Sequence, residues 1–554
     1  NYPAYTFETT KDQEITVDWI NDLVKNPDAC KDSTYPATDE ACNFIPHIVP
    51  VDRTLHWANP EGFPCDEARD NRARMEHRDC SVDPIALESM GSDPNILQVP
   101  YDGPVPGVVH VHGAHVAPEA DGYPEAWWLP RANNLDGYHE FGTLTNQFGI
   151  GRETNVPGTG TGTYIYGNDQ PSTTLWFHDH SLGMTRANVY AGPAGFWLIR
   201  EEGGGETGLV AGTLPAPAPV AGQGVLELNV PGDPARNAIR EIPIVIQGRS
   251  FNKDGSLFYP QNRAFFEGLG DGQESGQQGN RNAGLDIQTY GEGDSDIAPI
   301  WNPEAFFNVM VVNGVSWPEL EVAPAIYRFR LLNGTNSRFL NMAMHEIGNG
   351  GTLGQEVPFY QIGAEQSLLP QVVRIETGFA TPLPGDGSNV KANRPDCVKK
   401  GTKGGTVPNC VTAQPAPFVE QAMLMGPAER ADVLVDFRDM ADGTVIRMIN
   451  TAPDAPFGGF PDVPADPATT GQVMQFRVNA ALLGASDTDP TGATPATDPW
   501  SVALSLPDAD DPANSTGTFA AKQDLALLEE ESQTVCVNFD AVTGAIKQDL
   551  DAIV

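Results

Sequence analysis

The sequence predicts an all-β protein built from packed antiparallel sandwiches or Greek-key barrels. Short runs rich in Val, Ile, Phe and Tyr recur along the chain, and turn-forming residues separate them. The 554 residues include 57 Gly and 48 Pro, which is typical of many short strands joined by tight turns. Helical spacing is confined to a few segments, of which residues 15–25 are an example.

The individual strands can be placed from these runs in chain order. Each run combines β-branched or aromatic residues with a Gly, Pro, Asn or Asp turn nearby. The clearest runs are VPGVVHVH (105–112), TLWFHDH (174–180), GFWLIR (195–200), IPIVIQ (242–247), YRFRLLN (327–333), ADVLVDF (431–437) and VMQFRVNA (473–480).

Length and composition divide the chain into domains. A chain of this length is too long for one ordinary core and suggests roughly three to four units. A Gly/Ala/Pro stretch without periodicity covers residues 203–224, and a Pro/Asp-rich stretch covers residues 452–471. We therefore expect two complete domains and a third only begun, at residues 1–205 with an N-terminal extension, 225–455 and 466–554.

Six of the 7 cysteines form close pairs in sequence: Cys30 with Cys42, Cys65 with Cys80, and Cys397 with Cys410. Such pairs predict local disulfides, and the last would staple an insertion at residues 384–414 of the second domain. A structural zinc site is disfavoured because no cysteine has a second one two to four residues away. Cys536 is left over, and either a partner outside this chain or a free buried thiol would account for it.

Disulfides indicate an oxidising compartment, so we expect a secreted, extracellular or periplasmic protein. The sequence begins at Asn1 without a basic, apolar leader, which is compatible with a secretory signal already removed.

The charge balance narrows the range of partners. The net charge is −40 with only 33 Lys and Arg, and the acidic residues are spread along the chain. Nucleic acid and anionic membrane surfaces would repel such a protein, so neither is an expected partner. No run of about 18 apolar residues occurs, so no membrane-spanning helix is predicted.

Half of the 10 histidines lie in two short segments, HVHGAH and FHDHS. Residues i and i+2 of a strand share a face, so His110 with His112, and His178 with His180, each present two imidazoles side by side. A lone histidine is more often structural, but two such pairs predict a metal site that suits copper, zinc, iron or nickel. His115 follows a Gly-Ala break, and we expect it to support the site or the fold. The isolated histidines are expected to be structural: His47, His56, His77, His139 and His345.

Longer motifs carry a family resemblance. HVHGAH, DGYPEAWW and LWFHDHSLGMTRANVYAGPAGFWLI resemble the first cupredoxin domain of bacterial multicopper oxidases of the spore-coat laccase, bilirubin oxidase and phenoxazinone synthase branch. DGSLFYP, VVNGVSWPELEVAPAIYRFRLLNGTNSRF and GPAERADVLVDF resemble the middle domain, and VMQFRV resembles the strand that opens the third. The resemblance extends over residues 90–480 and implies tandem cupredoxin-like domains.

The resemblance also implies roles for individual residues. His110 would bind the type 2 copper, and His112, His178 and His180 would bind the type 3 pair. Asp121 matches an acid that helps to deliver protons to reduced oxygen, although an Asp before Gly122 could equally form a turn. Asp179 is expected to support the ligands. Family members couple one-electron oxidation of phenols, aromatic amines, bilirubin or metal ions to reduction of dioxygen to water.

The sequence departs from the family where the last domain should complete the site. It contains neither His-Pro-x-His-x-His nor His-Cys-His-x-x-x-His, and no histidine follows His345. Cys536 has no flanking histidine and does not fit a type 1 copper ligand. We therefore expect a separate C-terminal polypeptide to supply the type 1 site and complete the third domain. The alternative is a non-catalytic cupredoxin scaffold that binds one copper or none.

Overall fold

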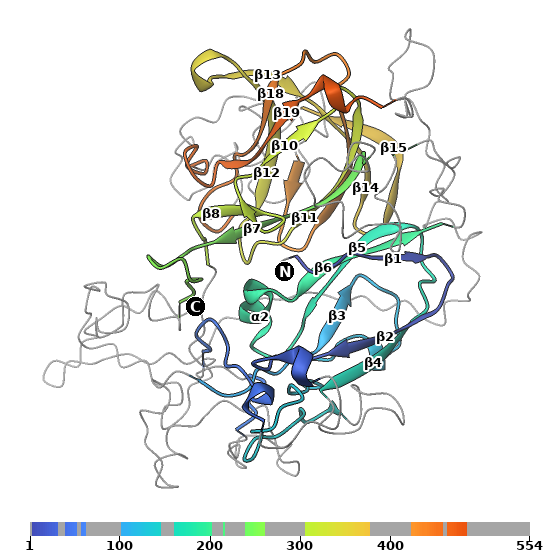
Figure 1. Cartoon of the computed structure of the whole chain (residues 1–554). Helices are drawn as coiled ribbons and strands as arrows, with labels where there is room; N and C mark the ends of the chain where they lie inside the picture. The colour runs from blue at the N-terminus through green and yellow to red at the C-terminus, as the bar shows by residue number, and fades with distance from the viewer. Residues whose placement is uncertain are drawn as a thin grey trace, which may run out of the picture.

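The computed structural model shows two β-rich units that pack against each other (Figure 1). It describes residues 3–30, 39–52, 57–61, 101–145, 160–201, 214–215, 239–260, 305–376, 423–457 and 463–484. The first unit comprises the described residues up to 201, and the second comprises those from 239 to 484. The predicted all-β class is confirmed, since strands make up nearly all of the regular structure in these residues.

The first unit contains a four-stranded sheet in the order β1-β6-β5-β3 and a separate β2-β4 pair. One α-helix, α2, connects β5 to β6 in the described part of the chain. A core rich in aromatic side chains, including Trp57, Trp127 and Trp197, fills this unit. The bounds are β1 (Phe7–Thr10), β2 (Ile15–Ile20), β3 (Val109–His112), β4 (Thr161–Tyr166), β5 (Thr173–Asp179), α2 (Thr185–Ala191) and β6 (Ala194–Arg200).

The second unit packs two larger sheets around one core. One sheet has the order β15-β14-β17-β11-β7-β8-β9, and the other has the order β10-β19-β18-β12-β13, with β16 also paired to β12. The bounds are β7 (Glu241–Arg249), β8 (Val309–Val312), β9 (Val315–Ser316), β10 (Glu319–Val322), β11 (Ile326–Asn333), β12 (Leu340–Ile347), β13 (Leu353–Val357), β14 (Phe359–Ala364), β15 (Ser367–Ile375), β16 (Met423–Met425), β17 (Arg430–Asp436), β18 (Val445–Asn450) and β19 (Gln472–Val478).

All seven predicted strand runs overlap strands of the structure, namely β3, β5, β6, β7, β11, β17 and β19. The sheets are not wholly antiparallel, because β1 with β6, β7 with β11, and β10 with β19 pair in parallel. Parallel neighbours arise where the chain crosses over between sheets rather than returning through a hairpin.

The prediction of helical structure from the spacing of residues 15–25 is wrong. Residues Ile15–Ile20 form β2, which pairs antiparallel with β4. Their burial alternates residue by residue, and Ile15, Val17 and Trp19 pack against the core of the first unit. In so short a segment the period-two pattern and the β4 partner decide the conformation.

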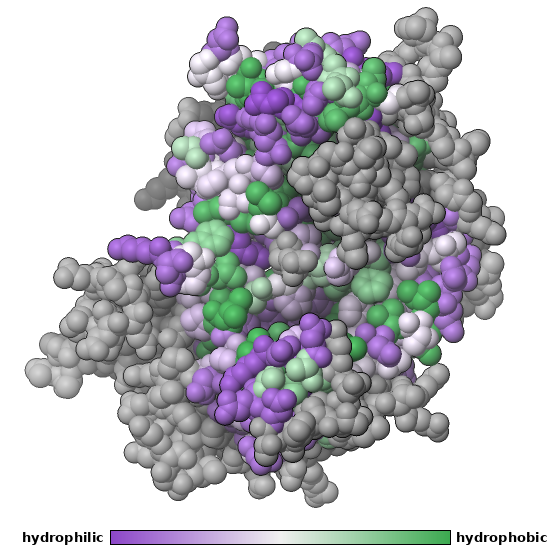
Figure 2. Space-filling model, viewed as in Figure 1, coloured by the Kyte–Doolittle hydropathy of each residue, from purple (hydrophilic) through white to green (hydrophobic). Residues whose placement is uncertain are grey.

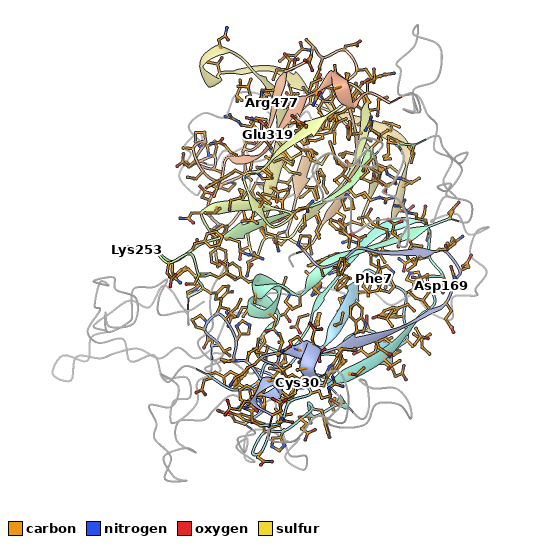
Figure 3. All side chains as sticks on the ribbon, viewed as in Figure 1. Phe7, Cys30, Asp169, Lys253, Glu319 and Arg477 are labelled. Carbon is orange, nitrogen blue, oxygen red and sulfur yellow. A yellow bond between two sulfur atoms is a disulfide. The ribbon has the colours of Figure 1, made fainter. Side chains whose placement is uncertain are left out.

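The run at residues 473–480 does not open a third domain as expected. It forms β19, which pairs with β10 and β18 within the second unit. Val473, Phe476 and Val478 lie in that unit's core. Arg477 and Glu319 form an ion pair of 2.8 Å across the β10-β19 edge (Figure 3). The second unit therefore extends to at least residue 478, beyond the predicted boundary at 455.

The predicted Cys30–Cys42 disulfide is present and lies buried in the first unit, where Figure 3 labels Cys30. Cys65, Cys80, Cys397, Cys410 and Cys536 lie outside the described residues, as do the insertion at 384–414 and most of the segment at 466–554. Within the described part of the chain, no helix has the length and apolar character needed to cross a membrane.

Candidate metal centre

Two adjacent antiparallel strands, β3 and β5, carry the histidine pairs. Their register places His110 opposite His178, and His112 opposite Trp176. Side chains alternate along β5, so Leu175 and Phe177 enter the core of the first unit. Trp176 and His178 therefore project from the other face of the sheet.

This other face is the one that packs against the second unit. Trp176, Phe196 and Leu198 of the first unit form one apolar cluster with Val245 and Leu332 of the second. In the space-filling view, apolar residues are visible along the band between the two units (Figure 2). The histidines thus lie outside the first unit's core and beside the seam between the units.

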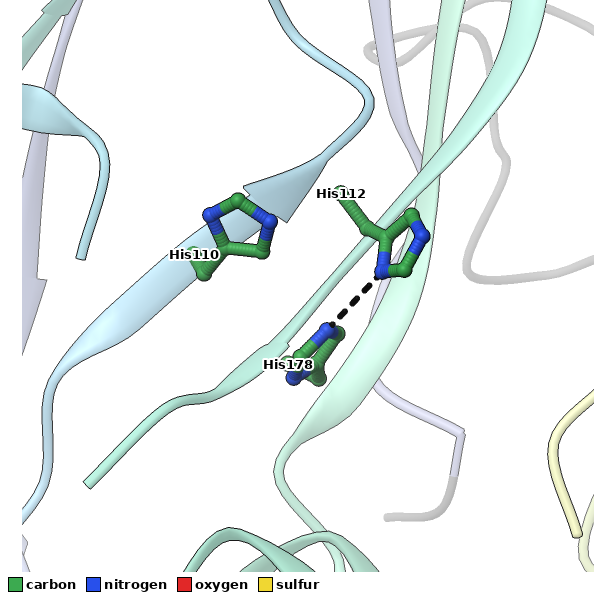
Figure 4. Close-up of side chains that lie close together, drawn as sticks. All are labelled: His110, His112 and His178. Atoms are coloured by element: carbon green, nitrogen blue, oxygen red, sulfur yellow. Dashed lines mark hydrogen bonds between the residues drawn. The ribbon is translucent and has the colours of Figure 1, made fainter. Parts of the chain in front are cut away.

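The four imidazoles converge. The ring of His110 lies 5.7 Å from that of His112, 5.4 Å from that of His178 and 5.1 Å from that of His180, centre to centre. Donor nitrogens of His110, His112 and His178 all lie within 4.8 Å of one another (Figure 4). His180 falls outside that tightest group, but its ring is still 5.8 Å from the ring of His178.

Backbone carbonyls orient two of the rings. Nδ1 of His110 donates to the carbonyl of Asp121 at 2.6 Å, and Nδ1 of His178 donates to the carbonyl of Asp179 at 2.7 Å. A carbonyl can only accept, so Nδ1 carries the hydrogen in both rings. Each neutral ring therefore keeps a lone pair on Nε2, as a metal ligand requires.

The spacing of His112 and His178 fits a shared metal ion. Nδ1 of His112 lies 3.3 Å from Nε2 of His178 (Figure 4). Two imidazole nitrogens bound at about 2.0 Å in tetrahedral geometry would stand roughly 3.3 Å apart. In addition, Nδ1 of His180 is buried without a hydrogen-bond partner among the described residues. The residues present therefore fit a metal ion held by imidazole nitrogens.

Burial keeps the imidazoles of His112, His178 and His180 neutral. It lowers the pKa of His112 to about 4, with a further contribution from the positive charge of Arg430. Burial also lowers the pKa of His178 to about 3, although the hydrogen bond to Asp179 opposes the shift. The pKa of His180 is lowered too, chiefly by burial. These rings are consequently available as metal ligands at neutral pH without the loss of a proton.

Two carboxylates flank the site and differ in exposure. Asp121 places Oδ1 3.2 Å from Nδ1 of His110, and its side chain is 53% exposed. It also precedes Gly122, whose φ of +76° marks a tight turn. Asp179 is buried and accepts hydrogen bonds from Val108 and Ser181, and burial raises its pKa to about 6. Its carboxylate thus links the end of β5 to the residue before β3, as expected of a supporting residue.

The other described histidines lie outside the cluster. The side chain of His115 is 66% exposed, with Nδ1 3.6 Å from Asp169. His47 bonds to the carbonyl of Val49 and to Asn188, while His345 is buried with Nδ1 3.2 Å from the carbonyl of Gly354. His139 donates its backbone N–H to Pro60, and His56 and His77 lie outside the described residues.

Sequence reasoning missed two residues beside the cluster. The ring of Trp176 lies 4.3 Å from that of His178 and 5.5 Å from that of His112. Its position two residues before His178 places it on the same face, so strand periodicity could have found it. Arg430 comes from the second unit, and no local signal reveals its approach to His112.

Comparison with known proteins confirms the resemblance to multicopper oxidases. No family model matches the chain. A laccase of Bacillus stratosphericus is 29% identical over 483 residues, covering 87% of this chain and 57% of that protein. A laccase of Bacillus subtilis is 25% identical over 481 residues, covering 87% of this chain and 56% of that protein.

A plant protein has the same class name, and a solved structure also aligns with part of the chain. The multicopper oxidase LPR1 homolog 1 of Oryza sativa is 26% identical over 390 residues, covering 70% of this chain and 44% of that protein. The McoA multicopper oxidase of Aquifex aeolicus aligns with a TM-score of 0.36 and 20% identity, covering 71% of this chain and 54% of that chain. The chain thus spans about half the length of the curated relatives it matches.

Proposed function

We propose that His110, His112, His178 and His180 form part of a trinuclear copper centre. The whole protein would couple one-electron oxidation of small phenolic, aromatic amine or metal-ion substrates to reduction of dioxygen to water. The convergence of four imidazoles on one face of two paired strands carries this proposal. Copper would supply the one-electron redox chemistry, and imidazole nitrogen is a ligand that suits it.

The proposed division of ligands is the one that the family resemblance implies. His112 and His178, whose nitrogens lie 3.3 Å apart, would bind the type 3 pair together with His180. His110, which faces Asp121, would bind the type 2 copper. Asp121 would carry protons between solvent and the centre, a role supported by its half-exposed carboxylate 3.2 Å from His110.

We propose that the remaining ligands come from protein outside this sequence. None of the 10 histidines follows His345, and the curated laccases are nearly twice as long as their matched regions. Mass and sequence analysis of the purified sample under denaturing conditions tests this. A His-Cys-His run outside this sequence, with about four coppers per complete site, is expected. A chain alone, with one copper or none and no blue colour, would instead fit the non-catalytic scaffold.

Copper binding by the chain tests the ligand assignment directly. Competition with a chelator at neutral pH should show that His178→Ala weakens copper binding by at least tenfold. His115→Ala is the matched control, because His115 lies in the same segment as His110 and His112 but is 66% exposed and lies beside Asp169. Equal affinities for both variants and the unaltered chain would refute the assignment.

We also propose that the protein functions in an oxidising compartment outside the cytoplasm. The Cys30–Cys42 disulfide supports this location, because such bonds persist where thiols are not kept reduced.

A further inference from the structure

Arg430 bridges the two units beside the histidine cluster. It is the first residue of β17 and is 3% exposed. Its Nε donates to the backbone carbonyl of Thr174 at 3.0 Å, four residues before His178 on β5. It also forms an ion pair with Glu365 of the second unit, whose carboxylate accepts from the Arg430 backbone N–H at 2.8 Å. The guanidinium therefore ties the ligand-bearing strand to the second unit.

The same guanidinium lies against the turn that follows His112. A Cβ on Gly113 would stand 3.1 Å from Nη2 of Arg430 and 2.7 Å from Nε2 of Gln366. Gly113 has a φ of +90°, so it serves both the turn and this close approach. Gln170 links the turn to the second unit, since its Nε2 lies 2.9 Å from both the Gly113 carbonyl and Oε1 of Gln366.

Two physical effects of Arg430 on a bound cation oppose each other. Its positive charge disfavours a second cation nearby. Burial is the larger cause of the low pKa of His112, and the charge of Arg430 lowers that pKa further. The adjacent carboxylate of Glu365 offsets much of that charge. The hydrogen bonds to β5 and the contact with Gly113 fix the backbone on either side of the ligands. Because the charge is largely paired, the fixed geometry should dominate.

We propose that Arg430 is a positioning residue that docks the second unit onto β5 and the Gly113 turn and thereby fixes His112 for metal binding. This role rests on the proposed copper centre and extends it. The second unit then takes part in metal binding without supplying a ligand, and its docking and the metal affinity of the first unit are coupled.

A small cavity beside Arg430 makes a shorter side chain tolerable there. It measures about 10 Å³ and is lined by Ser172, Thr174, Glu365, Arg430 and Asp432, among others. That is room for roughly one water molecule among polar partners. A lysine at position 430 can keep the charge and the Glu365 contact, but it cannot reproduce the several directed bonds of a guanidinium.

The test measures the copper affinity of the full chain for Arg430→Lys and Arg430→Met, by chelator competition and by the electron paramagnetic resonance spectrum of bound Cu²⁺. Arg338→Met is the matched control. The Arg338 side chain is 2% exposed and pairs with Asp454, which is 39% exposed; the Arg430 side chain is 2% exposed and Glu365 is 41% exposed. Both arginines belong to the second unit, but Arg338 bonds to Phe307, Pro453 and Asp454, none of which lies in β3 or β5.

Both Arg430 variants should weaken copper binding about tenfold or more and alter the nitrogen couplings in the spectrum. Arg338→Met should lower the thermal unfolding temperature but leave the affinity and the spectrum unchanged. If Arg430→Met does not fold, the copper affinity and the spectrum of Arg430→Lys test the inference.

Unchanged affinity in the Arg430 variants would overturn this inference and leave the copper centre standing. So would tighter binding by Arg430→Met with wild-type binding by Arg430→Lys, which would show an effect of charge alone. A wild-type chain that binds no copper would overturn the proposed centre itself, and this role with it.

Discussion

At the residue scale, the site depends on imidazoles that are buried or partly buried yet keep a lone pair free. The backbone achieves this, because the carbonyls of Asp121 and Asp179 accept hydrogen bonds from Nδ1–H of His110 and His178. Such bonds fix the tautomer and the ring plane before any metal arrives. Burial excludes the proton that would otherwise compete for the same nitrogen, as the pKa of about 3 at His178 shows.

The low pKa of His178 predicts acid sensitivity of the metal-free protein. The folded-state pKa lies below the unfolded value of 6.5, so the stability from the neutral ring is complete above pH 6.5 and is lost as pH falls toward 3. His178 is 7% exposed, and the loss should approach about 1.4 kcal/mol per pH unit in that window.

Urea unfolding of the metal-free chain and of His178→Asn between pH 7 and 5 measures this loss. Asn lacks the titrating ring but can still donate to the Asp179 carbonyl. The contributions of groups other than His178 to the pH dependence of stability cancel in the difference between the two proteins. Wild type should lose stability relative to the variant as pH falls. A difference that does not change with pH would contradict the burial argument.

At the element scale, strand periodicity made the site predictable. The i, i+2 spacing of His110 with His112 and of His178 with His180 gives two same-face pairs, and the β3-β5 register brings those pairs together. That the two strands are neighbours came only from the family resemblance, because pairing between distant segments leaves no local signal. The same limit explains the errors at β2 and β19, whose partners β4, β10 and β18 decided their conformation and their unit.

The turn at Gly122 should be essential to the position of β3. A Cβ there would lie 2.4 Å from the Val109 carbonyl oxygen and 2.9 Å from Cα of His110. We expect Gly122→Ala to destabilise the chain by about 1–3 kcal/mol beyond the backbone strain that alanine meets at positive φ. Copper affinity should fall as well, because β3 must shift.

Gly137→Ala is the control for that strain. Gly137 has a φ of +92°, but a Cβ there would meet no atom within 4 Å. Chemical denaturation and copper titration of both variants separate strain from collision. Equal losses in the two variants would mean that the packing of Gly122 against β3 is unimportant.

At the scale of the whole molecule, a buried charge network joins the two units. Glu241 of β7 pairs with Arg330 at 2.5 Å and with Arg200 of the first unit at 3.1 Å, and its side chain is 2% exposed. Burial acts to raise the pKa of Glu241, but Arg330, Arg328 and Arg200 outweigh it and hold the pKa well below its usual range. The carboxylate is therefore ionised throughout the neutral range, and the surrounding arginines depend on it.

Removal of this one charge should loosen the whole assembly. Glu241→Gln should destabilise the protein by about 3 kcal/mol, because it removes one of the two carboxylates, Glu241 and Asp432, that neutralise the buried Arg328 and Arg330. Glu319→Gln is the control, since Glu319 pairs with Arg477 at the surface, where solvent screens such pairs and they contribute little. Comparable losses in thermal unfolding would contradict the view that the buried seam holds the units together.

The large-scale organisation was the part least predictable from sequence. Strand runs identified seven of the strands, and local cysteine pairing identified the Cys30–Cys42 bond, because each depends on neighbours in the chain. The seam that places Arg430 beside His112 joins residues more than three hundred positions apart, and only the folded chain reveals it.

The most direct test of the copper centre is a crystal structure of the copper-loaded chain with diffraction recorded on both sides of the copper absorption edge. We expect an anomalous peak within about 2.0–2.2 Å of the donor nitrogens of His112 and His178, by analogy with other metal–imidazole bonds. Copper located only at other side chains, or no peak between β3 and β5, would contradict the account.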